Sequence, residues 1–164
     1  MAQRVVFCDA SPLIGLSLVN GLGWLESLFG VVCITDVIAD ELLPGSNKPG
    51  EAEIASAIAQ GHIRIVEDVC LEPAFPTLDE GEASILRAAV NQQGSCLVII
   101  DETAGRAVAS ALGFTVTGVV GVVIAARRQG LIASAKHVFE VLLQHDFRLA
   151  DTLIDAALKS LGEA

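Results

Sequence analysis

Five short apolar runs, separated by segments with helical character, constrain how this chain can fold more than any other feature. The runs lie at residues 4–8, 31–34, 63–67, 96–100 and 114–117. Strands that are apolar on both faces and alternate with helices are typical of a parallel sheet covered on its two sides. We therefore predict an α/β fold with three α/β/α layers around a central parallel sheet of about five strands.

Capping residues, prolines and glycines mark where the intervening helices begin and end. Ser11 and Pro12 fit the N-cap and first position of a helix over 12–19. Thr35 fits the cap of a helix over 36–43, and Thr77 with Glu80 fits a capping box that opens a helix over 78–91. Further helices are predicted over 24–28, 51–60, 102–112, 119–128, 135–144 and 151–161.

Length and composition favour one folded unit. The chain has 164 residues, of which 52% are hydrophobic, which excludes an intrinsically disordered protein. We expect a single domain over 1–164, with the C-terminal helices in 133–164 packed on it or extending it.

The net charge of −10 is concentrated in residues 1–82, which hold 13 acids and 3 bases. Such a chain has no general attraction for nucleic acid unless a basic patch or bound cations compensate. Residues 103–139 contain no acid and several bases, which fit either such a patch or solvated helix faces. These bases are Arg106, Arg127, Arg128 and Lys136.

Cysteine spacing and hydropathy indicate a reduced, cytoplasmic protein with no membrane segment. Cys8, Cys33, Cys70 and Cys96 form no CxxC pair, which excludes zinc-ribbon and thioredoxin-like motifs. No signal-peptide pattern is seen, and the longest apolar run, near 119–126, is too short to span a bilayer. The scattered histidines have no metal-ligand spacing, so we expect them to be structural or on the surface.

Four acids are expected at one edge of the sheet. Asp9 and Asp101 directly follow two predicted strands, Glu41 lies near the end of a helix, and Glu82 lies in the first turns of another. Sites in open α/β sheets form at the carboxyl ends of strands. Clustered carboxylates repel one another unless a cation compensates, and Mg²⁺ or Mn²⁺ prefers such oxygen ligands. The cation can activate water for attack on a phosphodiester.

Each of these residues also has a purely structural interpretation. Asp9 can be a turn residue, Glu41 a solvated helix acid, and Glu82 an acid favoured by the helix dipole. Glu102 can favour the start of the next helix, and Thr103 can cap it or orient a ligand. Arg106 can pair with Glu102 across one helical turn or, as the less favoured role, contact a phosphate.

The chain resembles PIN-domain proteins, in particular a bacterial PIN-like branch of uncharacterised function. The matching stretches are DASPLIGL from Asp9, VIADEL from Val37, LDEGEASIL from Leu78, the stretch from Val98 to Val123, and the tail from Gly130. The resemblance implies RNA cleavage with Mg²⁺ or Mn²⁺, often by toxins of toxin–antitoxin pairs that form dimers and are held inactive by a small protein partner.

The resemblance also assigns roles to individual residues. It implies that Asp9, Glu41, Glu82 and Asp101 are catalytic and that Asp9, Glu41 and Asp101 bind the metal, with Glu82 and Glu102 as further candidate ligands. Glu82 stands where PIN toxins more usually have Asp, and Glu102 where this branch commonly has a second Asp. We add Thr103 and Arg106 as candidate substrate-binding residues.

Two other functions compete with a toxin-like ribonuclease. The two glutamates and the acidic balance also fit a PIN-fold binding or regulatory module with weakened metal affinity that acts through protein partners. A phosphatase or phosphotransfer domain would use Asp9 as a nucleophile. It is disfavoured because Ser11 stands where haloacid-dehalogenase-like enzymes need a second Asp.

Overall fold

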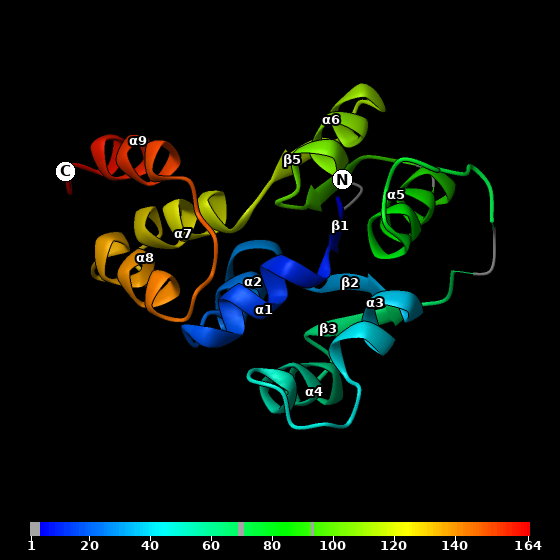
Figure 1. Ribbon diagram of the computed structural model, residues 1–164, viewed down its shortest axis with the longest axis horizontal. Helices are drawn as coiled ribbons and strands as arrows, with labels where there is room; N and C mark the ends of the chain where they lie inside the picture. The colour runs from blue at the N-terminus through cyan, green and yellow to red at the C-terminus, as the bar shows by residue number, and fades with distance from the viewer. Residues whose placement is uncertain (1–3, 69–70, 93) are drawn as a thin grey trace.

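The computed structural model describes residues 4–68, 71–92 and 94–164, and these contain one five-stranded sheet. All four strand pairings are parallel, and the strand order is β3-β2-β1-β4-β5 (Figure 1). The strands are β1 (Val5–Cys8), β2 (Val32–Thr35), β3 (Ile63–Val66), β4 (Cys96–Ile99) and β5 (Thr115–Thr117). With helices packed around this sheet, the predicted three-layer α/β/α class is confirmed.

β1 and β4 lie side by side at the centre of the sheet, with Cys8 opposite Ile99. The pairing continues past the strand ends, because Asp9 N–H donates to the Ile99 carbonyl at 2.9 Å. Ile100 N–H likewise donates to the Thr117 carbonyl at 2.8 Å. The chain therefore leaves the strands β1 and β4 at the same edge, where Asp9 directly follows β1 and Asp101 follows β4 after Ile100.

The helices follow the predicted segments closely, and the last three match them residue for residue. The helices in the described residues are α1 (Ala10–Leu18), α2 (Leu22–Phe29), α3 (Asp36–Leu42), α4 (Glu51–Ala59), α5 (Glu80–Asn91), α6 (Thr103–Ala111), α7 (Val119–Arg128), α8 (Ala135–Gln144) and α9 (Asp151–Leu161). The predicted cap of α3 is confirmed, because Thr35 Oγ1 accepts from Ile38 N–H at 3.2 Å.

The prediction that Ser11 caps the first helix is wrong. The helix α1 begins at Ala10, so Asp9 is its N-cap residue and Pro12 lies at the third helical position. Proline is tolerated there because the N–H groups of the first turn have no partner within the helix. The earlier start brings the Asp9 side chain to the junction of β1 and α1.

Two apolar clusters form the core. The first surrounds the sheet and includes Ile34, Ile85 and Val98, all fully buried. The second joins α7, α8 and α9 through residues such as Val123 and Phe139, and these helices lie together at the left of Figure 1. Three free cysteines, Cys8, Cys33 and Cys96, are buried, as expected for small apolar residues. Cys70 lies outside the described residues.

Among the described residues, no single helix is long and apolar enough to cross a membrane. The helices α1 and α2 reach the length and apolar composition of a membrane span only when they are taken together, as a pair bent by 115°.

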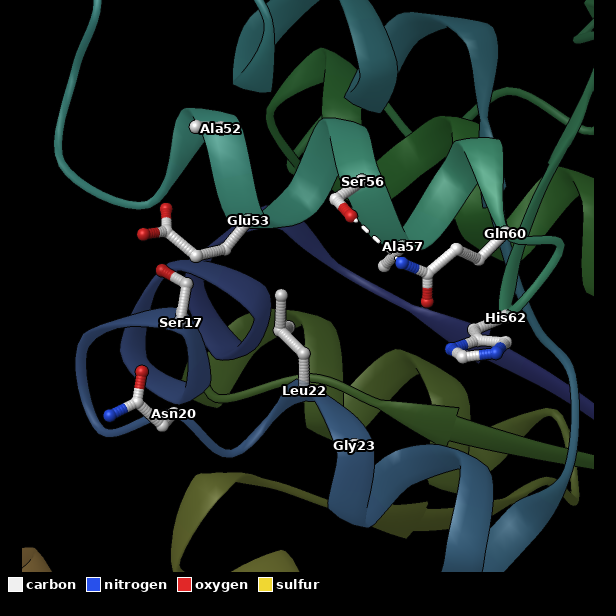
Figure 2. Close-up of a pocket in the computed structure, with 10 residues that line it drawn as sticks. All are labelled: Ser17, Asn20, Leu22, Gly23, Ala52, Glu53, Ser56, Ala57, Gln60 and His62. Carbon is white, nitrogen blue, oxygen red and sulfur yellow. Dashed lines mark hydrogen bonds between the residues drawn. The ribbon is translucent and has the colours of Figure 1, made fainter.

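A cavity of about 490 Å³ lies between α1, α2 and α4. Figure 2 shows Glu53, Ser56 and Gln60 on one wall, facing Ser17 and Leu22, with Gln60 bonded to Ser56 at 3.0 Å. Its lining includes none of the acids that the sequence analysis selected.

Candidate active site at the carboxyl edge of the sheet

Asp9 is a buried acid surrounded by other acids. It is 5% exposed, and its side chain makes no hydrogen bond across the first turn of α1. Burial raises the pKa of Asp9 from 3.8 to about 7, with smaller contributions from the charges of Glu82, Asp79 and Glu41, while the Ala10 N–H lowers it. These interactions place Asp9 in one electrostatic cluster with the carboxylates of α3 and α5.

Asp101 follows β4 and has one oxygen engaged and one without a partner. Asp101 Oδ1 accepts from Val119 N–H at the start of α7, at 2.9 Å. Oδ2 is buried and has no hydrogen-bond partner among the described residues. Burial, foremost, and then Glu102 raise the pKa of Asp101, while the Val119 N–H and Arg106 lower it. An ionised oxygen in this position fits a cation, because a buried carboxylate is costly without one.

Gly118 makes the Asp101 geometry possible. A Cβ atom at residue 118 would collide with Asp101 Oδ1 and lie 3.1 Å from Arg106 Nη1. The absence of a side chain therefore lets the start of α7 approach the Asp101 carboxylate closely enough for the Val119 N–H to bind it.

Glu82 is buried at the third position of α5, where it completes a capping box. Its N–H donates to Asp79 Oδ1 at 2.8 Å, and its Oε2 accepts from Asp79 N–H at 3.3 Å. Burial, foremost, and then Asp79 raise the pKa of Glu82, with further contributions from Glu102 and Glu41. Glu82 therefore belongs to the same electrostatic cluster as Asp9. The bond that it accepts in the capping box lowers its pKa, but burial and the neighbouring acids raise the pKa by more.

The capping box predicted from Thr77 and Glu80 is wrong, because the box lies two residues later. Aspartate is a stronger N-cap than threonine, and the start at Asp79 frees Glu80 to pair with Arg87 at 3.0 Å. The sequence analysis did not consider Asp79 for the site. Its position three residues before Glu82, as in a capping box, was the signal available.

Glu41 is exposed on α3 and approaches the start of α5. A Cβ atom at Gly81 would lie 3.2 Å from Glu41 Oε2 and 2.9 Å from Ile38 Cδ1. The glycine therefore lets α3 and α5 pack closely. A hydroxyl pair between Thr35, the last residue of β2, and Ser84 of α5, 2.7 Å apart, adds a contact beside the start of α3. The outcome is that Glu41 and Glu82, distant in sequence, lie near Asp9.

The start of α6 differs in detail from the prediction. Glu102 is its exposed N-cap residue and makes no side-chain capping bond, and Thr103 is the first helical residue and therefore not the cap. Arg106 does not pair with Glu102; its Nη1 donates to the Ile100 carbonyl at 2.9 Å. That bond satisfies a carbonyl beyond the end of β4 and keeps the guanidinium near Asp101.

The side chains at this edge are of the type that binds a hard divalent cation. All the clustered groups are carboxylate oxygens, which Mg²⁺ and Mn²⁺ prefer, and Asp101 Oδ2 is an orphaned buried acceptor. Within residues 4–68, 71–92 and 94–164, however, no three His, Cys, Asp or Glu side chains are already arranged to hold a metal ion.

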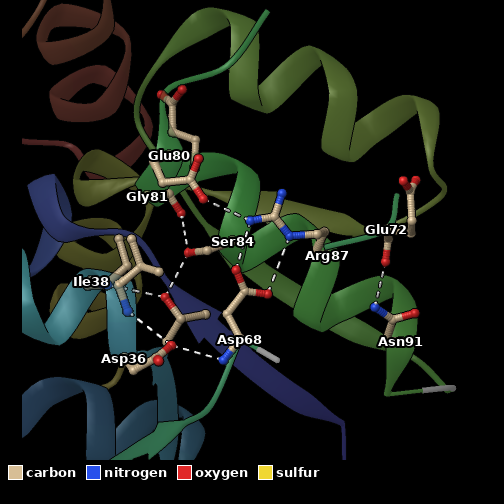
Figure 3. A network of polar contacts seen from close by, with 12 residues as sticks. Asp36, Ile38, Asp68, Glu72, Glu80, Gly81, Ser84, Arg87 and Asn91 are labelled. Atoms are coloured by element: carbon tan, nitrogen blue, oxygen red, sulfur yellow. Dashed lines mark hydrogen bonds and ion pairs between the residues drawn. The ribbon is translucent and has the colours of Figure 1, made fainter. Parts of the chain in front are cut away.

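A polar network on the other side of α5 holds this helix in place (Figure 3). Arg87 is 6% exposed and binds Asp68 through two bonds, of 2.7 and 3.3 Å. Asp36 Oδ1 accepts from Asp68 N–H at 2.9 Å. The network therefore ties α5 to the start of α3 and to the segment after β3, the elements that position Glu82 and Glu41.

The fold and this edge together define an α/β protein with an acidic site at the carboxyl ends of its parallel strands. Residues 5–163 match a family described as a PIN domain, and the chain belongs to the PIN-domain family. The PIN domain is a nuclease-type fold whose members typically use divalent metals. A comparison with curated proteins finds no match.

Proposed function

We propose that this protein is a divalent-metal-dependent ribonuclease that hydrolyses RNA phosphodiesters at the acidic edge, as the toxin of a toxin–antitoxin pair. The observation that carries the proposal is the cluster of Asp9 with Glu41, Asp79 and Glu82 beside the unpaired Asp101 oxygen. Carboxylates that raise one another's pKa in this way are unfavourable for folding alone and are typical of functional sites. Family membership supports the nuclease class.

Asp9, Glu41 and Asp101 would hold the metal ion, with Glu82 and Glu102 as further ligands. When bound, Mg²⁺ or Mn²⁺ supplies a Lewis acid and an activated water molecule. The α1 N-terminus places Asp9 at the strand end, and the Val119 N–H fixes Asp101 Oδ1 so that Oδ2 remains available. With its pKa near 7, Asp9 retains a proton in part of the metal-free molecules at neutral pH.

Thr103 and Arg106, at the start of α6, are our candidate substrate contacts. Arg106 already lies beside Asp101 while bonded to the Ile100 carbonyl, so its charge offsets part of the negative field at the edge. A small antitoxin protein and a second copy of the chain are the partners that accompany this proposal.

Metal binding tests the proposal without a choice of RNA. We expect Mn²⁺ to bind wild type saturably by titration calorimetry and to lose that binding in Asp9→Asn and in Asp101→Asn. Glu140→Gln, which changes an exposed acid on α8, is the matched control and should bind as wild type does. A mixed single-stranded RNA pool should then be cut by wild type and the control only. Unchanged Mn²⁺ binding in both site variants would reject the site.

A PIN-fold binding module that acts through protein partners is the second candidate. The observation that favours it is the lack of a preformed three-ligand group among the described residues. This alternative predicts no Mn²⁺ binding by wild type, with or without RNA, and no RNA cleavage, so the same experiment separates the two functions.

A further inference from the structure

A second cavity adjoins the acidic edge and shares Glu41 with it. The cavity, of about 340 Å³, lies between α1, α3, the loop before α4, and the end of α8. This volume is within the range of small-molecule sites, roughly 300–1,000 Å³. Because Glu41 lies both in its lining and in the cluster around Asp9, a molecule in the cavity would extend directly to the acidic edge.

The cavity is lined by apolar side chains and by two basic residues. Ile14 and Leu18 of α1 form part of the walls, and Ile14 is 38% exposed, unlike the neighbouring core residues Leu13 and Leu16. Lys48 and His145 are the basic residues of the lining. Within the part of the chain that the structure describes, neither the Lys48 ammonium nor the His145 imidazole has a hydrogen bond or ion pair to another residue.

The loop that carries Lys48 is fixed in place by a side chain of the cavity itself. Glu51 Oε1 accepts from Gly45 N–H at 2.6 Å, and its Oε2 accepts from Lys48 N–H at 3.0 Å. Both oxygens of this carboxylate are therefore engaged by the loop backbone. Lys48 is also one of only three basic residues in the acidic first half of the chain, and it lines the same cavity as Glu41, one of the proposed catalytic acids.

We propose that this cavity holds the base and sugar of the RNA nucleotide next to the scissile phosphodiester. Apolar walls suit the faces of a nucleobase, and free Lys and His donors suit the adjoining phosphate. A volume of about 340 Å³ is in the range of sites that hold one such unit. The inference rests on the proposed function, because it takes the acidic edge as the place of cleavage.

The cavity of Figure 2 does not share these properties. Its lining lacks every acid of the cluster, and its one basic side chain, His62, contacts Glu26 at 3.2 Å. The Lys48 side chain, unpaired among the described residues, and continuity with the acidic edge thus favour the cavity beside Glu41.

Nucleotide binding can be measured without cleavage. The ¹⁵N-labelled full chain is titrated with 5′-UMP and 5′-AMP, and separately with ribose 5-phosphate and inorganic phosphate, while amide NMR signals are followed. We expect saturable shifts at Ile14, Lys48 and His145 with the nucleotides only. Lys48→Glu should weaken nucleotide binding about tenfold. Lys159→Glu, an identical charge change at an exposed position of α9, should leave it unchanged.

Three results would overturn the inference. Equal shifts with inorganic phosphate would mean an anion site without base recognition, and an absence of shifts at these residues would mean no site. If RNA is cut and Lys48→Glu and His145→Ala leave kcat/KM and the cleavage positions unchanged, the inference fails while the ribonuclease stands. If nucleotides bind here but no RNA is cut with Mg²⁺ or Mn²⁺, the ribonuclease fails and the nucleotide site stands.

Discussion

Two buried groups of acids lie near α5 in opposite circumstances. In one group Asp68 is almost completely buried but is held by two bonds from Arg87. In the other, Asp9 and Glu82 are equally inaccessible and are surrounded by further acids. The first arrangement stabilises the fold because the desolvated charge is paired. The second opposes folding, and this unfavourable burial is the basis of our proposal that the carboxylates bind a cation.

The largest expected effect on stability comes from removal of Arg87, the cation that pairs with the buried Asp68. Arg87→Met should lower the free energy of unfolding by about 3–5 kcal/mol, because it leaves Asp68 buried without its cation. Urea denaturation followed by circular dichroism measures the change. Arg64→Met, at an exposed arginine of β3, should stay within about 0.5 kcal/mol of wild type. Similar losses in both variants would refute a special role for the Arg87 network.

Removal of a charge from the acidic cluster, which among the described residues has no cation to pair with, should instead raise the free energy of unfolding. The pKa of Asp9 is about 7 in the folded protein against 3.8 ordinarily, so folded wild type loses stability as pH rises from about 4 to 7. Asp9→Asn removes that loss and should stabilise the metal-free protein at pH 8 by up to about 4 kcal/mol.

The gain from Asp9→Asn should fade as pH falls toward 4, where Asp9 is protonated in the folded protein. Urea denaturation at pH 5 and pH 8, with metal removed by chelation, measures this dependence. A gain of the same size at both pH values would show that packing, and not ionisation, is responsible.

A smaller effect is expected at the glycine that admits the Asp101 carboxylate. Gly118→Ala places a Cβ against Asp101 Oδ1 and should cost about 1–3 kcal/mol of stability through overpacking. We also expect weaker Mn²⁺ binding, because Asp101 must shift. Gly23→Ala is the control, since a Cβ there meets no atom within 4 Å; equal Mn²⁺ affinity in the two variants would contradict this role for Gly118.

The smallest effect should come from Glu163, a compensated acid at the far end of the molecule. Its carboxylate accepts from Ser134 Oγ and Ala135 N–H, both at 2.9 Å, and lies 3.5 Å from Arg127 Nε. These contacts, the Ala135 N–H foremost, lower the pKa of Glu163. Glu163→Gln should therefore reduce Tm modestly near pH 7.

The Glu163 contribution should disappear as pH falls below its ordinary value of 4.5 and through the lowered pKa. Thermal denaturation across this range, with Glu140→Gln on exposed α8 as control, provides the measurement. A Tm difference that does not diminish as pH falls would mean that the amide fails for steric reasons.

The sequence was most informative where structure is governed locally. The predicted ranges 119–128, 135–144 and 151–161 coincide with α7, α8 and α9, because their apolar periodicity and end signals agree. The starts of α1 and α5 were each missed by two residues. In both places two candidate caps competed. Asp9 and Ser11 are about equally favoured as caps. At α5 the spacing of Thr77 and Glu80 fits a capping box as well as that of Asp79 and Glu82, although aspartate is the stronger cap.

The sequence by itself determined the parallel α/β class and the placement of Asp9 and Asp101 after strands. Strand ends are local features, and parallel strands bring those ends to one edge. Only the tertiary structure decided that Asp79 joins the acids, that Gly118 admits Asp101, and that Lys48 and His145 border one cavity. These features depend on helices distant in the chain meeting side by side, and no local pattern of residues encodes the distance between two such helices.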